Sequence, residues 1–373
     1  MRHTTRAAAI AGVVAAVTAT AAGPAAAATG HRPSGAVFVQ ANGLDGNTIV
    51  AYDRQLHPAG TFATGGRGGI EAGAVADPLA SQGSLTLDAR RHLLYAVNAG
   101  SDTITVFGVH GTRLTRLQVI GSGGAFPVGV AVHGDLVYVL NARDGGSVQG
   151  FRRIGSRLVR VPAWHRALGL DPAAAPEFTH SPGQVAFSPD GRRLLVTTKG
   201  NTDEILVYGV DALGAPAPHP VRNAQPGTAP FALAFDRFGH VVVAQAGPNA
   251  AATFDQRRDG RLIPRAATPT GGQATCWVIG VNGTFYLSNA GSATITAFRT
   301  RADGTLQNLG TTSTAGAGTI DTAASSDGKV LYAQTGGGTD AVQAFTVGRD
   351  GKLTSTGSVT VPGGANSEGI AAY

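Results

Sequence analysis

The sequence contains little cysteine, few charged residues and no long apolar run after its N-terminal region, and each shortage excludes a class of protein. Cys276 is the only cysteine among 373 residues, so no disulfide can form within one chain. Charged residues make up 14% of the chain, and its net charge of +6 comes without a lysine or arginine run. Nucleic-acid binding is therefore not expected. No later segment has the length and hydrophobicity of a transmembrane helix, so no membrane insertion is expected either.

Common catalytic and metal-binding motifs are also missing. No His-x-His, His-Glu-x-x-His or Cys-x-x-Cys spacing indicates a zinc site, and no Gly-x-Ser-x-Gly nucleophile turn occurs. Glycine-rich stretches such as residues 336–338 fall between strands rather than between a strand and a helix, which disfavours a nucleotide loop. We expect no cofactor and no resident metal, with a calcium or magnesium ion on channel carboxylates as the open alternative.

Residues 1–28 have the three-part pattern of a secretory signal peptide. Two arginines precede a weakly apolar, alanine-rich run, and Ala26–Ala28 offers small residues for cleavage near Thr29. A membrane anchor is the alternative, but threonine, glycine and proline interrupt the run. We therefore expect a secreted, extracellular protein whose residues 29–373 form a single domain.

The stretch 93–107, LLYAVNAGSDTITVF, has the pattern of strand, turn and strand, and it recurs along the chain. The seven copies end at successive spacings of 55, 44, 57, 46, 44 and 47 residues, on the aromatic residues Tyr52, Phe107, Phe151, Tyr208, Phe254, Phe298 and Phe345. Four of these spacings lie near the period of about 40–50 residues that is typical of propeller blades.

Further strands flank most copies. Gly183–Phe187 precedes a Ser-Pro-Asp-Gly turn, and Asp-Gly-x-Leu phrases such as residues 259–262 open a fourth strand. The sequence therefore predicts an all-β, seven-bladed β-propeller of four-stranded antiparallel blades. The first blade lacks an inner strand, and residues 366–373 have the pattern of one, so we expect the C-terminal strand to complete the N-terminal blade. An open solenoid is the alternative, which would expose sheet edges.

The two longest spacings contain insertions at residues 65–82 and 164–182. Each lies between the outer strand of one blade and the inner strand of the next, on the face where ligands commonly enter a propeller channel. They are expected to form a rim or lid, with tolerated loop growth as the alternative.

Three phrases, LYAVNAGSDTITVF, SPDGRRLLVTTKGNTDEILVY and SNAGSATITAFRTRADGTL, resemble the blades of the seven-bladed lactonase family. That family contains 6-phosphogluconolactonase and 3-carboxymuconate-cyclase-like proteins, and the phrases also resemble YVTN-type surface propellers. The resemblance implies a hydrolase or cycloisomerase that acts on a small lactone or muconolactone.

This chain departs from the family pattern at four places. The family's Pro-His-x-His-Ser phrase corresponds to His180-Ser-Pro-Gly here, and its Asp-Leu-Gly turn corresponds to Lys199-Gly-Asn. A family glutamate corresponds to Ala99, and an Asn-Glu-Leu phrase to Gln245-Ala-Gly. The departures favour a second hypothesis, in which the propeller has lost the family's catalytic residues and only binds a ligand.

Equivalent positions of the inner strands should form rings around the channel, because side chains alternate between the two faces of a strand. Asp321 and Glu368 share one ring on adjacent blades. Two close carboxyl groups cannot both ionise easily, so one pKa should rise and the pair would suit acid/base catalysis. A structural cap on channel water is the alternative. The same ring also holds Ser84, Gly129, Gln184, Ala232 and Cys276, and the ring two residues earlier holds Asn366.

Candidate site residues thus fall into two groups. The catalytic candidates are Asp321, Glu368 and, as a general base, His180, with an exposed loop histidine as its alternative. The substrate-binding candidates are Ser84, Gln184, Arg67, Cys276 and Asn366. Arg67 would pair with a substrate carboxylate, or else lie solvated on its loop, and Cys276 would be a nucleophile or a small buried apolar residue. The expected partner is a small-molecule or carbohydrate ligand in the central channel of a monomer.

Overall fold

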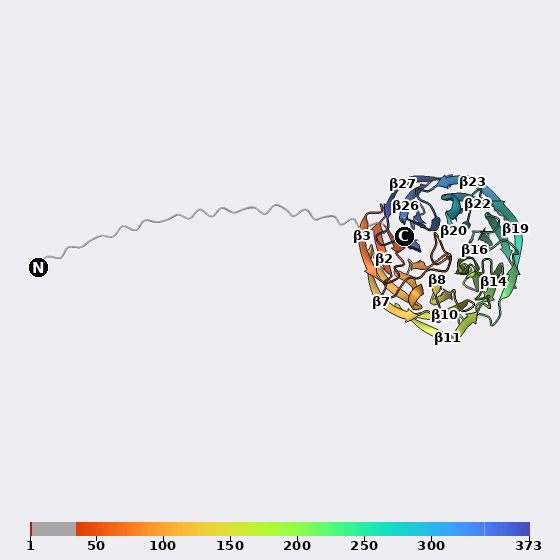
Figure 1. Ribbon diagram of the computed structural model, residues 1–373, viewed down its shortest axis with the longest axis horizontal. Coiled ribbons are helices and arrows are strands. Elements are labelled where there is room, and N and C mark those ends of the chain that lie inside the picture. Colours follow the sequence, from red (N-terminus) through yellow and green to blue (C-terminus); the bar gives the residue numbers. More distant parts are fainter. Residues whose placement is uncertain (2–34, 339) are drawn as a thin grey trace. The chain divides into compact units, whose positions relative to one another are not determined.

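The computed structural model describes residues 1, 35–338 and 340–373, and its strands form seven four-stranded antiparallel sheets arranged in a ring (Figure 1). The predicted seven-bladed propeller is confirmed. The predicted signal peptide lies outside the described residues, apart from Met1.

Blades 1 to 4 take their strands in chain order, except that the last strand of the chain joins blade 1. Blade 1 contains β28 (Ile370–Ala372), β1 (Ala36–Gln40), β2 (Thr48–Asp53) and β3 (Pro58–Ala63). Blade 2 contains β4 (Leu85–Asp88), β5 (Leu93–Asn98), β6 (Thr103–His110) and β7 (Arg113–Gly121). Blade 3 contains β8 (Pro127–His133), β9 (Leu136–Asn141), β10 (Ser147–Ile154) and β11 (Arg157–Ala167). Blade 4 contains β12 (Gln184–Phe187), β13 (Arg193–Thr197), β14 (Glu204–Gly209) and β15 (Val221–Ala224).

The remaining blades repeat the same order from the inner to the outer strand. Blade 5 contains β16 (Pro230–Phe235), β17 (His240–Gln245), β18 (Ala250–Gln256) and β19 (Leu262–Pro269). Blade 6 contains β20 (Thr275–Val281), β21 (Thr284–Asn289), β22 (Thr294–Thr300) and β23 (Leu306–Ser313). Blade 7 contains β24 (Thr319–Ala324), β25 (Val330–Thr335), β26 (Ala341–Val347) and β27 (Leu353–Thr360). The short helices are η1 (Ala99–Ser101), α1 (Glu177–His180) and η2 (Ala290–Ser292).

The C-terminal strand closes the ring as predicted. Strand β28 pairs antiparallel with β1, with Val37 opposite Ala372 and Val39 opposite Ile370. The Tyr373 hydroxyl donates to the Gly111 carbonyl oxygen at 3.0 Å, which ties the chain end to blade 2 as well. Closure gives β1 a partner on each side, β28 and β2, so its edge is not exposed.

Apolar side chains from the middle strands fill the space between neighbouring blades. The aromatic residues that end the seven repeats are all buried, and six tyrosines are less than 2% exposed: Tyr52, Tyr95, Tyr138, Tyr208, Tyr286 and Tyr332. Each blade buries its two faces only against the neighbouring blades. The apolar and aromatic positions that make these contacts therefore recur in every repeat of the sequence.

The recurring Asn-Ala-Gly-Ser turn has a structural role. The Asn98 amide donates to the hydroxyls of Thr103 and Thr105 at 3.1 and 3.0 Å. Four blades later the Asn289 amide donates to Thr294 and Thr296 at the same two distances. The turn asparagine thus satisfies threonine hydroxyls of the following strand and is not left free for a ligand.

Across the described residues, no helix is long and apolar enough to cross a membrane.

Candidate functional site

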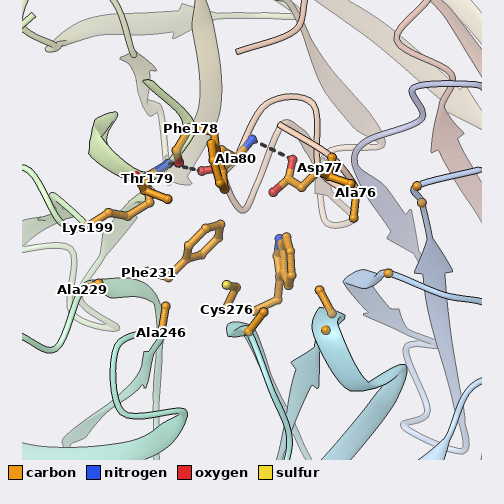
Figure 2. Close-up of a pocket in the computed structure, with 18 of the residues that line it drawn as sticks. Ala76, Asp77, Ala80, Phe178, Thr179, Lys199, Ala229, Phe231, Ala246 and Cys276 are labelled. Carbon is orange, nitrogen blue, oxygen red and sulfur yellow. Dashed lines mark hydrogen bonds between the residues drawn. The ribbon is translucent and has the colours of Figure 1, made fainter. Parts of the chain in front are cut away.

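A pocket of about 400 Å³ opens at one end of the channel, between the first insertion and the turns of blades 4 to 7 (Figure 2). We call it the channel pocket. Asp77 and Ala80 of the first insertion lie on one side of it, and Phe231 and Cys276 face them from blades 5 and 6. Its other lining residues are Val75, Ala76, Phe178, Thr179, Lys199, Ala229, Ala246, Ala274, Trp277, Ala290, Gly291, Ala317, Gly318, Gly336 and Gly337.

The first insertion crosses the channel and is anchored on the far blade. The Gln82 side chain makes two hydrogen bonds with the Val278 backbone in β20, at 3.0 and 2.9 Å. The Trp277 indole N–H donates to the Ser81 carbonyl oxygen at 2.9 Å. On the near side, the Ser81 hydroxyl donates to the Val128 carbonyl oxygen at 2.7 Å. This segment therefore forms the lid that was one of the two interpretations of the insertion.

Lys199 joins both insertions to blade 4. Its ammonium donates to the carbonyl oxygens of Ala80 and Phe178, each at 2.6 Å, and to the Ser181 hydroxyl at 2.7 Å. An ammonium has three N–H donors, so these bonds occupy all of them. Burial lowers the Lys199 pKa, while the Glu71 carboxylate 3.9 Å away raises it. Lys199 therefore stabilises the lid, and none of its N–H groups remains to bind a ligand.

The two insertions also bind each other. The Ser181 hydroxyl donates to the Glu71 carboxylate at 2.6 Å, and the Ala72 N–H donates to the Glu177 carboxylate at 2.7 Å. Burial raises the pKa of Glu71 to about 8, against the opposing charge of Lys199. The insertions thus form one double lid with a buried polar seam.

Apolar side chains dominate the rest of the channel pocket. The rings of Phe231 and Trp277 lie 5.0 Å apart between centroids, at 58° to each other. Among the lining residues that the structure describes, Lys199 is the only cation, and its three N–H groups already donate to protein acceptors. The pocket therefore suits an uncharged molecule with an apolar body better than a phosphorylated one.

Asp77 is the carboxyl group that lines this pocket. Its Oδ1 accepts the N–H groups of Leu79 and Ala80 at 3.0 and 2.7 Å, and its Oδ2 accepts that of Ser81 at 3.0 Å. These donors stabilise the anion, because a carboxylate is an acceptor only. Burial nevertheless raises the Asp77 pKa, against the opposing hydrogen bond with Glu368 and the charge of Lys199.

Glu368 is fully buried and interacts electrostatically with Asp77. No N–H or O–H group of the described residues donates to its carboxyl oxygens. Burial and the neighbouring Asp77 charge raise the Glu368 pKa far above its usual range. The Asp77 charge opposes ionisation of Glu368, so one proton is expected on this pair of carboxyl groups. We place that proton on Glu368, because Asp77 has three backbone donors and Glu368 has none.

Asp321 faces the opposite end of the channel. It lines a second cavity of about 570 Å³, with Gln82, Gln184 and His133 among its neighbours. Burial raises the Asp321 pKa to about 8, with a further contribution from the Asp77 charge. Asp321, Asp77 and Glu368 therefore interact electrostatically, but Asp321 lines a different cavity from Asp77.

The predicted substrate-binding residues of the inner ring separate in the structure. Cys276 lines the channel pocket, and burial raises the pKa of its thiol to about 12. Gln184 lines the second cavity, where its carbonyl oxygen accepts the Leu233 N–H at 2.6 Å. Ser84 is buried and donates to the Glu368 carbonyl oxygen at 3.2 Å. Asn366 is half-buried and lines neither cavity.

Neither Arg67 nor His180 lines the channel pocket. Arg67 is on the rim of a shallow surface depression, where its guanidinium donates to the Gly100 carbonyl oxygen at 3.2 Å. His180 ends α1 and lines a side pocket of about 210 Å³ with Arg143 and Glu177. Its Nδ1 lies 2.9 Å from the Pro176 carbonyl oxygen. The structure brings neither residue to Asp77.

Sequence reasoning missed Asp77, Glu71 and Lys199 as site residues. Asp77 and Glu71 come from an insertion that no other blade repeats, so a comparison of repeats could not select them. Lys199 follows its strand at the position that holds Ala99, Ala142, Ala246 and Ala290 in other blades, because Leu194 pairs with Tyr208 as Leu94 pairs with Phe107. A cation at a position that is alanine in four other blades was the available signal.

Comparison with known proteins agrees with this architecture. A protein-family model described as "Lactonase, 7-bladed beta-propeller" matches residues 85–367. No curated protein sequence matches the chain.

Solved structures with the same fold include a putative 6-phosphogluconolactonase from Bacteroides fragilis, with 16% sequence identity and a TM-score of 0.66. The match covers 91% of this chain and 98% of that one. The periplasmic gluconolactonase of Pseudomonas aeruginosa has 17% identity and a TM-score of 0.69, over 90% of this chain and 98% of its own. A virginiamycin B lyase from Staphylococcus aureus has 12% identity and a TM-score of 0.53, over 74% and 84%. At these identities the likeness shows the fold alone.

Proposed function

Because this chain belongs to the seven-bladed β-propeller lactonase family, we propose that it hydrolyses a small, uncharged lactone in the channel pocket. The observation that carries the proposal is the Asp77 carboxyl group, which lines an apolar pocket of about 400 Å³ and interacts electrostatically with the buried Glu368. A carboxylate whose pKa is raised by burial is a competent general base near neutral pH.

In this mechanism the Asp77 carboxylate takes a proton from a water molecule, whose oxygen attacks the lactone carbonyl carbon. The tetrahedral adduct collapses as the ring carbon–oxygen bond breaks. Asp77 then returns the proton to the departing ring oxygen, which leaves a hydroxy acid. Phe231 and Trp277 would hold the apolar body of the substrate. Glu368 would be a positioning residue, since its buried carboxyl group interacts with Asp77 and tunes the Asp77 pKa.

The substrate class follows from the charges of the pocket. A phosphorylated sugar lactone needs a free cation or several N–H donors for its phosphate. The ammonium of Lys199 is already occupied by three acceptors. We therefore propose alkyl- or aryl-substituted γ- and δ-lactones in place of 6-phosphogluconolactone.

Turnover of a lactone panel by the purified chain tests the proposal, with Asp77→Asn as the critical variant. We expect the substitution to lower kcat by about 10²- to 10⁴-fold, the usual contribution of a general base. Asp45→Asn is the control, because Asp45 is exposed on a loop outside the channel pocket. Equal turnover by wild type and Asp77→Asn, with both folded by circular dichroism, would refute the assignment.

A non-catalytic binding propeller is the second candidate. The bonds that already occupy both oxygens of Asp77 and all donors of Lys199 favour it. Saturable quenching of Trp277 fluorescence by a lactone that is never hydrolysed would support this candidate over the first.

We also propose that the chain is exported, as the pattern of residues 1–28 predicts. Expression with the native N-terminus, followed by mass spectrometry of the extracellular fraction, should give a chain that starts near Thr29.

A further inference from the structure

The positive charge of this protein is concentrated in one part of the ring. The segment from β6 to β11, Thr103–Ala167, contains eight arginines and two aspartates. Its formal charge equals the whole net charge of +6, so the rest of the chain is balanced at 21 basic and 21 acidic residues. Blades 2 and 3 therefore carry the basic surface of the molecule.

Four of these arginines lie on two neighbouring outer strands. Arg113 and Arg116 are in β7, Arg157 and Arg160 are in β11, and all four are exposed. We call these four residues the arginine patch. Figure 1 shows β7 and β11 on the outer rim of the ring. The patch is continuous, because the Gln118 side chain bridges the two strands through two hydrogen bonds with the Leu158 backbone, at 3.0 and 2.7 Å.

The patch is unlike the other outer strands. Strands β3, β23 and β27 contain no arginine or lysine. In β15 and β19 the arginines are neutralised, since Arg222 pairs with Glu204 and Arg265 with Asp255. Among the described residues, no carboxylate pairs with an arginine of the patch. Protection of sheet edges by charge would apply to every blade, so it does not account for this asymmetry.

Exposed apolar side chains lie beside arginines of the patch and beside Arg152 of β10. Ile154, the last residue of β10 and the partner of Arg157, is 62% exposed, and Val159 of β11 is 48% exposed. Leu213 is 73% exposed, and its carbonyl oxygen accepts a hydrogen bond from Arg152 of β10, which places it at the same rim. Single exposed apolar residues are ordinary, but here several adjoin unpaired cations.

We infer that this rim is a docking surface for an anionic lipid bilayer. Unpaired arginines bind lipid phosphate and carboxylate groups, and short apolar side chains at turn tips enter the headgroup region. A soluble polyanion would use the arginines but would gain nothing from Ile154 and Leu213, so the apolar residues favour the bilayer. No residue of the patch lines the channel pocket, which stays accessible when the rim is bound. The inference is independent of the proposed function.

Vesicle co-sedimentation of the full chain tests the inference. We expect binding to vesicles of equal parts phosphatidylglycerol and phosphatidylcholine, no binding to pure phosphatidylcholine, and release at roughly 1 M salt. Substitution of Arg113, Arg116, Arg157 and Arg160 by glutamine should weaken binding by at least about tenfold. Ile154→Ser combined with Leu213→Ser should weaken it while the salt dependence remains.

The matched control replaces four arginines at the corresponding hairpin of blade 5, which are Arg257, Arg258, Arg261 and Arg265. It removes the same charge from an exposed turn, and should change vesicle binding by less than about twofold. All variants keep the basic N-terminal residues, so differences between them report the rim. Equal loss in the control, no loss in the patch variant, or binding to heparin without binding to vesicles would each overturn the inference.

Discussion

The Lys199 ammonium and the Ala80 carbonyl oxygen lie 2.6 Å apart, although 119 residues separate them in the chain. The same ammonium binds Phe178 and Ser181 of the second insertion. One side chain from a blade-4 turn thus fixes both halves of the lid over the channel pocket.

Replacement of this lysine should loosen the lid before it affects the blades. Lys199→Met removes three hydrogen bonds from a charged donor and leaves Glu71 without its counter-charge, so we expect the free energy of unfolding to fall by about 3 kcal/mol. Hydrogen exchange should accelerate in residues 70–81 and 176–181 well above its change in the blade strands. Lys329→Met is the control, since Lys329 is exposed. Uniform acceleration throughout the ring would contradict the role of Lys199 as a lid anchor.

The buried carboxyl groups should make the fold more stable in mild acid than in mild base. Burial raises the pKa of Asp321 to about 8 in the folded chain, whereas the unfolded chain has the ordinary value near 3.8. Between these values the native state binds more protons, so this stabilisation is complete below pH 4 and is lost as the pH rises to 8. Asp321→Asn should reduce the decrease of the free energy of unfolding with pH by up to about 1.4 kcal/mol per pH unit.

Urea denaturation at intervals from pH 4 to 8 measures this effect as the difference between wild type and Asp321→Asn. Asp45→Asn controls for the loss of a carboxylate, since Asp45 is exposed. Parallel curves for wild type and Asp321→Asn would show that Asp321 titrates in the folded chain as it does in the unfolded one.

The fold could be predicted from sequence because every blade repeats it. A buried aromatic ends the hairpin in all seven repeats, Asp-Gly turns precede the outer strands of blades 5 to 7, and the inner-strand pattern at residues 366–373 indicates how the ring closes. Because the blade occurs seven times, its sequence pattern can be recognised even where one copy departs from it.

The site could be predicted only in part, because it depends on features that do not repeat. Alternation along the inner strands predicts Asp321 and Glu368 in one ring, but the register of β24 shifts between Thr319 and Thr322. A β-bulge changes the direction of the side chains that follow it. Counting positions along the strand then no longer tells which face of the sheet a side chain lies on. Glu368 precedes β28 and interacts with Asp77. Asp77 lies on the first insertion, 291 residues earlier in the chain.

Cys276 should line the channel pocket as a small side chain and should not act as a nucleophile. Burial raises its thiol pKa to about 12, so almost no thiolate forms at neutral pH. We expect Cys276→Ala to retain turnover within about threefold, and Cys276→Leu to raise KM strongly by filling the pocket. Iodoacetamide should modify the native thiol far more slowly than a free cysteine at pH 8. Rapid alkylation combined with inactive Cys276→Ala would indicate a covalent mechanism.

Closure of the ring by β28 should be required for a monomeric fold. Deletion of residues 370–373 removes the partner of β1 and the packing of Tyr373 on Phe38, whose rings lie 6.4 Å apart. The free edge of β1 would then pair with other chains, so we expect aggregation on size-exclusion chromatography and a melting temperature several degrees lower. Tyr373→Phe is the milder control, since it loses only the hydrogen bond to Gly111 and should stay monomeric. A monomeric deletion variant with an unchanged melting temperature would mean that blade 1 is stable with three strands.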